Sequence, residues 1–67
     1  MRISYNKLWK MLIDKNMKKS DLKEQAGISS ASLAKLGKGD NITTDVLIKI
    51  CETLHCRLED IMETVDD

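Results

Sequence analysis

Residues 19–36, KSDLKEQAGISSASLAKL, predict two short helices joined by a tight turn at Gly27, Ile28 and Ser29. Glycine suits this turn because the chain must reverse through a left-handed residue, a conformation that costs other residues free energy. Ile28 is expected to fill the angle between the two helices, and Ser29 is expected to cap the second one. The stretch therefore predicts a helix–turn–helix motif over about residues 19–37.

The second helix of this motif begins with small polar residues. Its first turn holds Ser29, Ser30 and Ser32. Its apolar side is expected to consist of Leu33, Leu36 and either Ala31 or Ala34. A helix with so slim a start can approach another surface closely, and its N-terminal amide groups can face a phosphate. That construction is typical of helices that read DNA, so it favours a binding module over an enzyme.

The segment before the motif predicts a further helix over about residues 5–15, with Ser4 as its cap. Asn16 is expected to end this helix in the left-handed conformation, which asparagine tolerates better than most residues. Ser20 is then expected to cap the first helix of the motif, with Asp21 adding favourable charge near its positive end.

The segment after the motif predicts a glycine-rich turn and two more helices. The turn covers residues 37–41, GKGDN. A fourth helix, capped by Thr43 or Thr44, carries a broad apolar face. The last helix is expected over about residues 58–64 and is weakened by about 1 kcal/mol because Arg57 stands in the place of a capping residue. The result is an all-α fold of five helices.

The composition agrees with one small helical domain. The chain has 67 residues, with no Pro, no Phe and one Trp. A core of Leu, Ile, Val, Met and Ala suits packed helices and lacks the aromatic residues that favour strands. No apolar run approaches the roughly 20 residues needed to cross a bilayer, and no signal-peptide segment follows the start. We therefore expect a cytoplasmic protein without membrane association.

The charges are sorted along the chain although they cancel overall. Residues 1–39 contain nine basic and three acidic side chains, for a net charge of +6. Residues 40–67 contain two basic and eight acidic side chains, for a net charge of −6. A dipolar molecule of this kind can present a basic face to phosphate and keep an acidic face in solvent. Because the basic half contains the motif, this distribution favours DNA as the partner.

Cys51, His55 and Cys56 raise the question of a zinc site. They supply only three ligands, and Cys56 lies off the helix face that the other two share, so no metal is predicted. His55 is interpreted as a surface residue that ends a helix. Two cysteines five residues apart in one helix point in different directions, so no disulfide is expected. Cys51 is interpreted as a small core residue.

The sequence offers no catalytic apparatus, so an enzyme is not expected. No base is placed to activate the serines of the motif, and the pair Glu59 and Asp60 stands where acids favour a helix start. The glycine loop at residues 37–41 follows no strand, which argues against nucleotide binding. No cofactor motif or small-molecule effector pocket is recognisable.

The whole pattern resembles the Xre-like helix–turn–helix transcriptional regulators, the family of phage Cro and repressor DNA-binding domains. The resemblance spans about residues 8–62. It rests on Leu22, the AGIS turn at residues 26–29, Leu33, Leu36, the glycine loop, and LIKICETLHCRLEDIM at residues 47–62. It implies a single DNA-binding domain over residues 1–67 with a five-helix, lambda-repressor-like fold, in which the third helix lies in the major groove.

The resemblance also implies which residues contact double-stranded DNA. The positions expected to face base edges are Ser30, Ala31, Ser32 and Lys35. The positions expected to contact phosphate are Lys18, Lys19, Ser20, Ser29, Lys38 and Asn41.

Two departures from the family pattern affect the motif. Lys23 stands where a small alanine is usual, so either its stem runs along the surface or the helices splay slightly. Ser30 and Ala31 replace the long polar side chains that make bidentate base contacts. Direct readout is therefore expected to be thin, and DNA shape becomes a second source of specificity.

The favoured hypothesis is a sequence-preferring transcriptional regulator that binds an operator with two half-sites as a homodimer. One module binds weakly, whereas two linked modules gain affinity through effective concentration. The last helices are expected to supply the dimer surface, with Ile61, Met62 and Val65. Two alternatives stay open: an antitoxin-like or adaptor module whose acidic half binds another protein, and a nonspecific architectural DNA binder.

Overall fold

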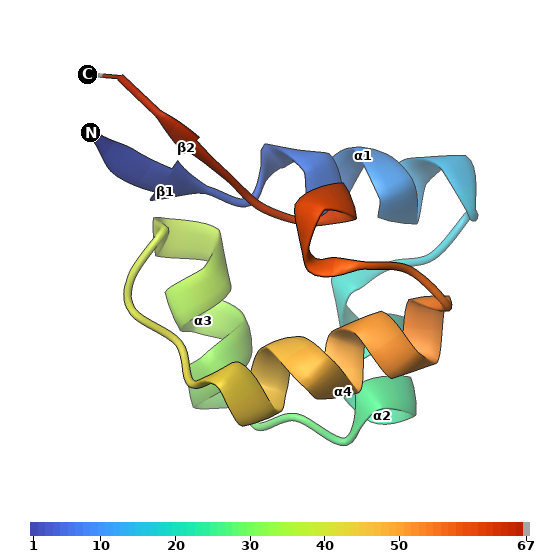
Figure 1. Ribbon diagram of the computed structural model, residues 1–67. Helices are drawn as coiled ribbons and strands as arrows, with labels where there is room; N and C mark the ends of the chain where they lie inside the picture. The colour runs from blue at the N-terminus through green and yellow to red at the C-terminus, as the bar shows by residue number, and fades with distance from the viewer. Residues whose placement is uncertain (67) are drawn as a thin grey trace.

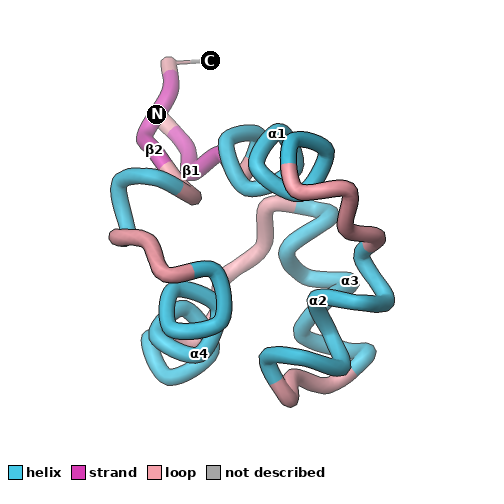
Figure 2. The backbone as a smooth tube through the Cα atoms, turned by 90° about the vertical axis from the view of Figure 1, so that its right-hand side faces the viewer, coloured by secondary structure: helices cyan, strands magenta, loops and turns pink. Residues whose placement is uncertain are grey.

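The computed structural model describes residues 1–66, which form four α-helices, a short 3-10 turn and a two-stranded sheet. In chain order the elements are β1 (Arg2–Ser4), α1 (Asn6–Asp14), α2 (Lys19–Ala26), α3 (Ser30–Lys38), α4 (Thr44–Leu54), the 3-10 turn η1 (Leu58–Asp60) and β2 (Glu63–Val65). Figure 1 shows the two strands side by side, with both ends of the chain at the same edge of the molecule. Figure 2 shows α1 at the top of the molecule, with α4 below it on one side and α2 and α3 below it on the other.

The four α-helices of the described chain all end in the same way. Each is followed by a residue at positive φ: Asn16 (55°), Gly27 (67°), Gly39 (73°) and His55 (54°). The next N–H then donates to the carbonyl five residues earlier: Met17 to Leu12 at 2.8 Å, Ile28 to Lys23 at 3.1 Å, Asp40 to Lys35 at 2.9 Å and Cys56 to Cys51 at 3.0 Å. This is the Schellman motif, which satisfies carbonyls left without partners at a helix end. The left-handed endings expected at Asn16 and Gly27 are confirmed.

Two of the expected helix caps are confirmed. The Ser29 hydroxyl accepts the N–H of Ser32 at 3.1 Å, and the Thr43 hydroxyl accepts the N–H of Val46 at 3.4 Å. Each side-chain oxygen thereby satisfies an amide that has no partner within its helix. The cap of the fourth helix is therefore Thr43 and not Thr44.

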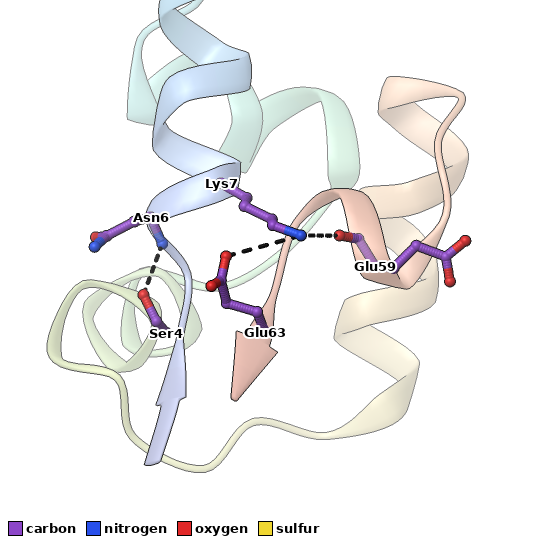
Figure 3. A network of polar contacts seen from close by, with 5 residues as sticks. All are labelled: Ser4, Asn6, Lys7, Glu59 and Glu63. Atoms are coloured by element: carbon purple, nitrogen blue, oxygen red, sulfur yellow. Dashed lines mark hydrogen bonds and ion pairs between the residues drawn. The ribbon is translucent and has the colours of Figure 1, made fainter. Parts of the chain in front are cut away.

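Two other caps differ from expectation: α1 is capped at Tyr5 instead of Ser4, and α2 at Lys18 instead of Ser20. Helix α2 begins before Ser20, and the backbone N–H of Lys18 donates to the Asp21 carboxylate at 2.9 Å. A carboxylate at this position also interacts favourably with the positive end of the helix. Ser4 lies in β1, and its buried hydroxyl accepts the N–H of Asn6 at 3.3 Å (Figure 3). The turn expected over residues 37–41 is also shorter, because α3 continues through Lys38.

One fully buried side chain from each α-helix and one from the C-terminal segment form the centre of the core. They are Leu8, Leu22, Leu36, Ile50 and Ile61. Burial of a large aliphatic side chain contributes roughly 1.5–3 kcal/mol, so this group accounts for much of what holds the helices together. Ile28 is 6% exposed, as expected for a residue that fills the angle between α2 and α3.

The prediction of a fifth helix is wrong, because this segment forms one 3-10 turn and a strand of a small sheet. After the single turn η1, the chain extends into β2, which pairs antiparallel with β1 in the register Arg2–Val65, Ile3–Thr64 and Ser4–Glu63. The β-branched residues in these segments favour extended backbone. Burial of Ile61 directs the chain into the core just before it extends. The expectation of an all-α fold is therefore corrected to a mostly helical one.

Lys7 fastens this C-terminal segment to the first turn of α1. Its Nζ donates to the carbonyl oxygen of Glu59 at 3.0 Å and lies 3.8 Å from a carboxylate oxygen of Glu63 (Figure 3). One lysine of the basic half is thus bonded within the molecule.

None of the helices in residues 1–66 is long and apolar enough to span a membrane.

Candidate nucleic-acid interface

Helix α3 presents a continuous exposed face made of small and basic residues. Ala31, Ala34, Lys35 and Lys38 are all exposed, at the spacing that places residues on one side of a helix. Leu36 is 1% exposed and Leu33 is half-buried on the opposite side. Neither alanine belongs to the apolar side, so the alternatives left open for Ala31 and Ala34 are both excluded. Ala34 is a surface residue of this face that sequence reasoning missed.

The start of α3 is held by two serines and exposes a third. The Ser29 hydroxyl, besides capping the helix, donates to the hydroxyl oxygen of Ser32 at 3.1 Å. Ser32 is half-buried, and its hydroxyl is engaged in this cap. Ser30 is exposed and makes no such bond among the described residues. Of the positions expected to face bases, Ser30, Ala31 and Lys35 therefore protrude, whereas Ser32 lies closer to the body of the molecule.

Four exposed lysines in and beside the motif differ from Lys7, which is bonded to Glu59 and Glu63. Lys18, Lys19, Lys35 and Lys38 make no ion pair with any residue among 1–66. Their charges are consequently available to an anionic partner. All four lie in the half of the chain that carries the net charge of +6.

Trp9 contributes to this surface from α1, which sequence reasoning missed. The Lys19 Nζ lies 4.4 Å from the centroid of the Trp9 ring, within the range of a cation–π interaction. Trp9 is half-buried and packs against the core, so its ring is a firm support for the ammonium group. Because the two residues are ten positions apart on different helices, no spacing rule in the sequence could indicate the contact.

The positions expected to contact phosphate fall into two groups. Lys18, Lys19 and Ser20 lie together at the start of α2, whereas Lys38 and Asn41 lie at the far end of α3. Helix α3 has nine residues, which corresponds to a length of about 13 Å. Asn41 also lines a hollow of about 410 Å³ beside β1. Ser29, the remaining expected position, caps the start of α3 and lies between these two groups in the chain. The six positions therefore do not form one continuous segment.

Lys23 is accommodated by the ending of α2. It is half-buried, and its carbonyl accepts the N–H of Ile28 at 3.1 Å in the Schellman motif. That motif brings the two side chains it joins next to each other. The lysine stem can then cover Ile28 while the ammonium group reaches solvent, which favours the surface-stem interpretation over splayed helices.

The comparisons with known proteins agree with this arrangement. A family model described as a Cro/C1-type HTH DNA-binding domain matches residues 7–67. A solved structure, the crystal structure of transcriptional regulator VanUg, Form II, is 52% identical in sequence, with a TM-score of 0.94. The match covers 98% of this chain and 88% of that chain. No curated protein matches this chain. The chain belongs to the Cro/C1-type helix–turn–helix family of DNA-binding domains.

Proposed function

We propose that this protein is a sequence-preferring transcriptional regulator that places α3 in the major groove of double-stranded DNA. The observation that carries the proposal is the exposed face of α3, which combines small side chains with lysines that form no ion pair within residues 1–66. The major groove is about 12 Å wide and admits an α-helix. Small residues at Ser30, Ala31 and Ala34 would permit close approach, and the exposed lysines would contact the phosphates of the two strands.

The same face indicates how much of the sequence would be read directly. Exposed alanine methyl groups can contact the methyl group of thymine, and Ser30 can bond to any base edge. Lys35 is the one long polar side chain among the four positions expected to face bases. Few bidentate contacts are available, so part of the sequence preference would come from DNA shape and deformability.

A homodimer would supply the affinity that one small module lacks. The surface first expected for it needs revision, because Ile61 is fully buried and cannot form an interface. Ile48 and Leu58 are better placed, since these large apolar residues are 51% and 47% exposed on α4 and η1. On this proposal the dimer acts in the cytoplasm on two half-sites, about 34–36 Å apart or a multiple of that distance.

Selection of bound duplexes from a random pool tests the proposal, with the molar mass of the selected complex measured by light scattering. We expect a two-fold symmetric consensus and two chains per duplex. Enrichment without a consensus would instead indicate an architectural binder. No binding to any duplex at low salt would leave the antitoxin-like or adaptor hypothesis, in which the main partner is another protein.

A further inference from the structure

The two cysteines lie together, contrary to the expectation that they point apart. Helix α4 ends at Leu54, and His55 takes up the left-handed conformation with φ of 54°. Cys56 is therefore outside the helix, and its N–H donates to the carbonyl of Cys51 at 3.0 Å. The expectation failed because it continued the helix through Cys56.

This helix ending brings the two thiols into contact. A Schellman motif commonly brings the side chain of the residue whose carbonyl accepts this bond against that of the residue whose N–H donates it. In the other helices these positions hold pairs such as Leu12 and Met17, whereas in α4 both are cysteines. Both thiols are free and half-buried, and both line a shallow hollow of about 410 Å³.

The surroundings distinguish the two thiols. Burial, the charge and hydrogen bond of the neighbouring Cys51 side chain, and the charge of Asp60 raise the pKa of Cys56 to about 11, against a lowering influence of Lys15. At neutral pH Cys56 is thus a protonated thiol, which makes it a poor first nucleophile. No group of three metal-ligating side chains gathers within residues 1–66.

We propose that Cys51 and Cys56 form a redox modification site that closes an intramolecular disulfide when it meets a low-molecular-weight disulfide. The Cys51 thiolate attacks one sulfur of that reagent, which releases one thiol and leaves a mixed disulfide. Cys56 then loses its proton and attacks the Cys51 sulfur, which releases the second thiol. Two protein thiols are oxidised and one reagent disulfide is reduced to two thiols. The proposal does not depend on the DNA-binding function.

The test treats the whole chain with oxidised glutathione and follows its mass. We expect a monomer lighter by about 2 Da, with two thiols lost to alkylation and no retained glutathione. The Cys56→Ser variant should instead retain one glutathione on Cys51, because it lacks the thiol that completes the reaction. Accumulation of two glutathione adducts on the wild-type chain, or of covalent dimers, would overturn the proposal.

A comparison of the folded chain with the chain in urea isolates the contribution of the fold. The short spacing of the two cysteines permits some closure in any flexible chain. If the end of α4 holds the thiols in contact, closure of the mixed disulfide should be at least about tenfold faster in the folded protein. Equal rates in the two states would contradict the proposal even if the disulfide forms. Circular dichroism of Cys56→Ser and of Cys51→Ser checks that each variant is folded.

Discussion

The ammonium group of Lys19 rests on the ring of Trp9, with 4.4 Å between Nζ and the ring centroid. The contact joins α1 to the start of α2, where the helix–turn–helix motif begins. Under the proposed function, a cation held there would be oriented before DNA arrives, so less side-chain freedom would be lost on binding.

Substitutions of Trp9 and Lys19 should therefore have non-additive effects on the free energy of unfolding. We expect Trp9→Leu and Lys19→Ala to show a coupling free energy of about 0.5–1 kcal/mol in a double-mutant cycle on unfolding by urea. Lys10→Ala serves as the control, since Lys10 is an exposed lysine of α1 without a ring contact in residues 1–66. Strictly additive effects of the Trp9 and Lys19 substitutions would show that the contact contributes nothing in solution.

Of the serines at the start of α3, Ser29 should contribute to stability, whereas Ser30 should not. Ser29→Ala removes the hydroxyl that accepts the Ser32 amide, and we expect a loss of about 1 kcal/mol in the free energy of unfolding. Ser30→Ala should change that free energy by less than about 0.5 kcal/mol, because the residue is exposed and forms no cap. Urea denaturation measures both, and similar losses for the two variants would contradict the assigned cap.

The substitution of glycine by alanine should change the free energy of unfolding in opposite directions at Gly27 and Gly37. Gly27 has a φ of 67°, so Gly27→Ala should lower the free energy of unfolding by about 1 kcal/mol although no atom lies within 4 Å of the added Cβ. Gly37 lies within α3 with equally open space around it, so Gly37→Ala should raise that free energy by about 0.5–1 kcal/mol. Thermal unfolding of both variants would reveal the difference. A stabilising Gly27→Ala would show that the turn does not need its left-handed residue.

The corrected C-terminal segment makes its own prediction. Ile61 is fully buried in the core, so Ile61→Ala should cost about 2–5 kcal/mol of stability, enough to unfold a fraction of so small a domain. Ile13→Ala is the matched control, because Ile13 is 73% exposed and its truncation should cost less than about 1 kcal/mol. A small effect of Ile61→Ala would place that residue back on the surface.

Features that depend on neighbouring residues were predicted correctly from the sequence, whereas features that depend on distant residues were not. The motif was predictable because its determinants are local: Ser29 bonds to the amide three residues later, and Gly27 takes up a backbone angle set by its own lack of a side chain. The same holds for Asn16 and Thr43.

The features that were missed depend on residues distant in the chain. The sheet pairs Arg2 with Val65, and neither three-residue strand has a pattern that indicates its partner. The cation–π contact of Trp9 and the thiol pair depend on where helices end and how they pack. The C-terminal segment was mistaken for a helix because Leu58 and Ile61 stand at helical spacing, a signal that cannot be distinguished from one turn followed by burial.

The proposed function depends on contact between DNA and the exposed face of α3, which carries small and basic side chains. The most direct measurement is fluorescence anisotropy of a labelled duplex over a series of salt concentrations, comparing Lys35→Ala with Lys49→Ala. Both lysines are exposed, one on the proposed face of α3 and the other on α4 in the acidic half of the chain. We predict that Lys35→Ala weakens binding roughly 3–10-fold and reduces the log–log salt slope by about one, whereas Lys49→Ala changes neither. Equal binding and equal salt slopes for the two variants would contradict the account.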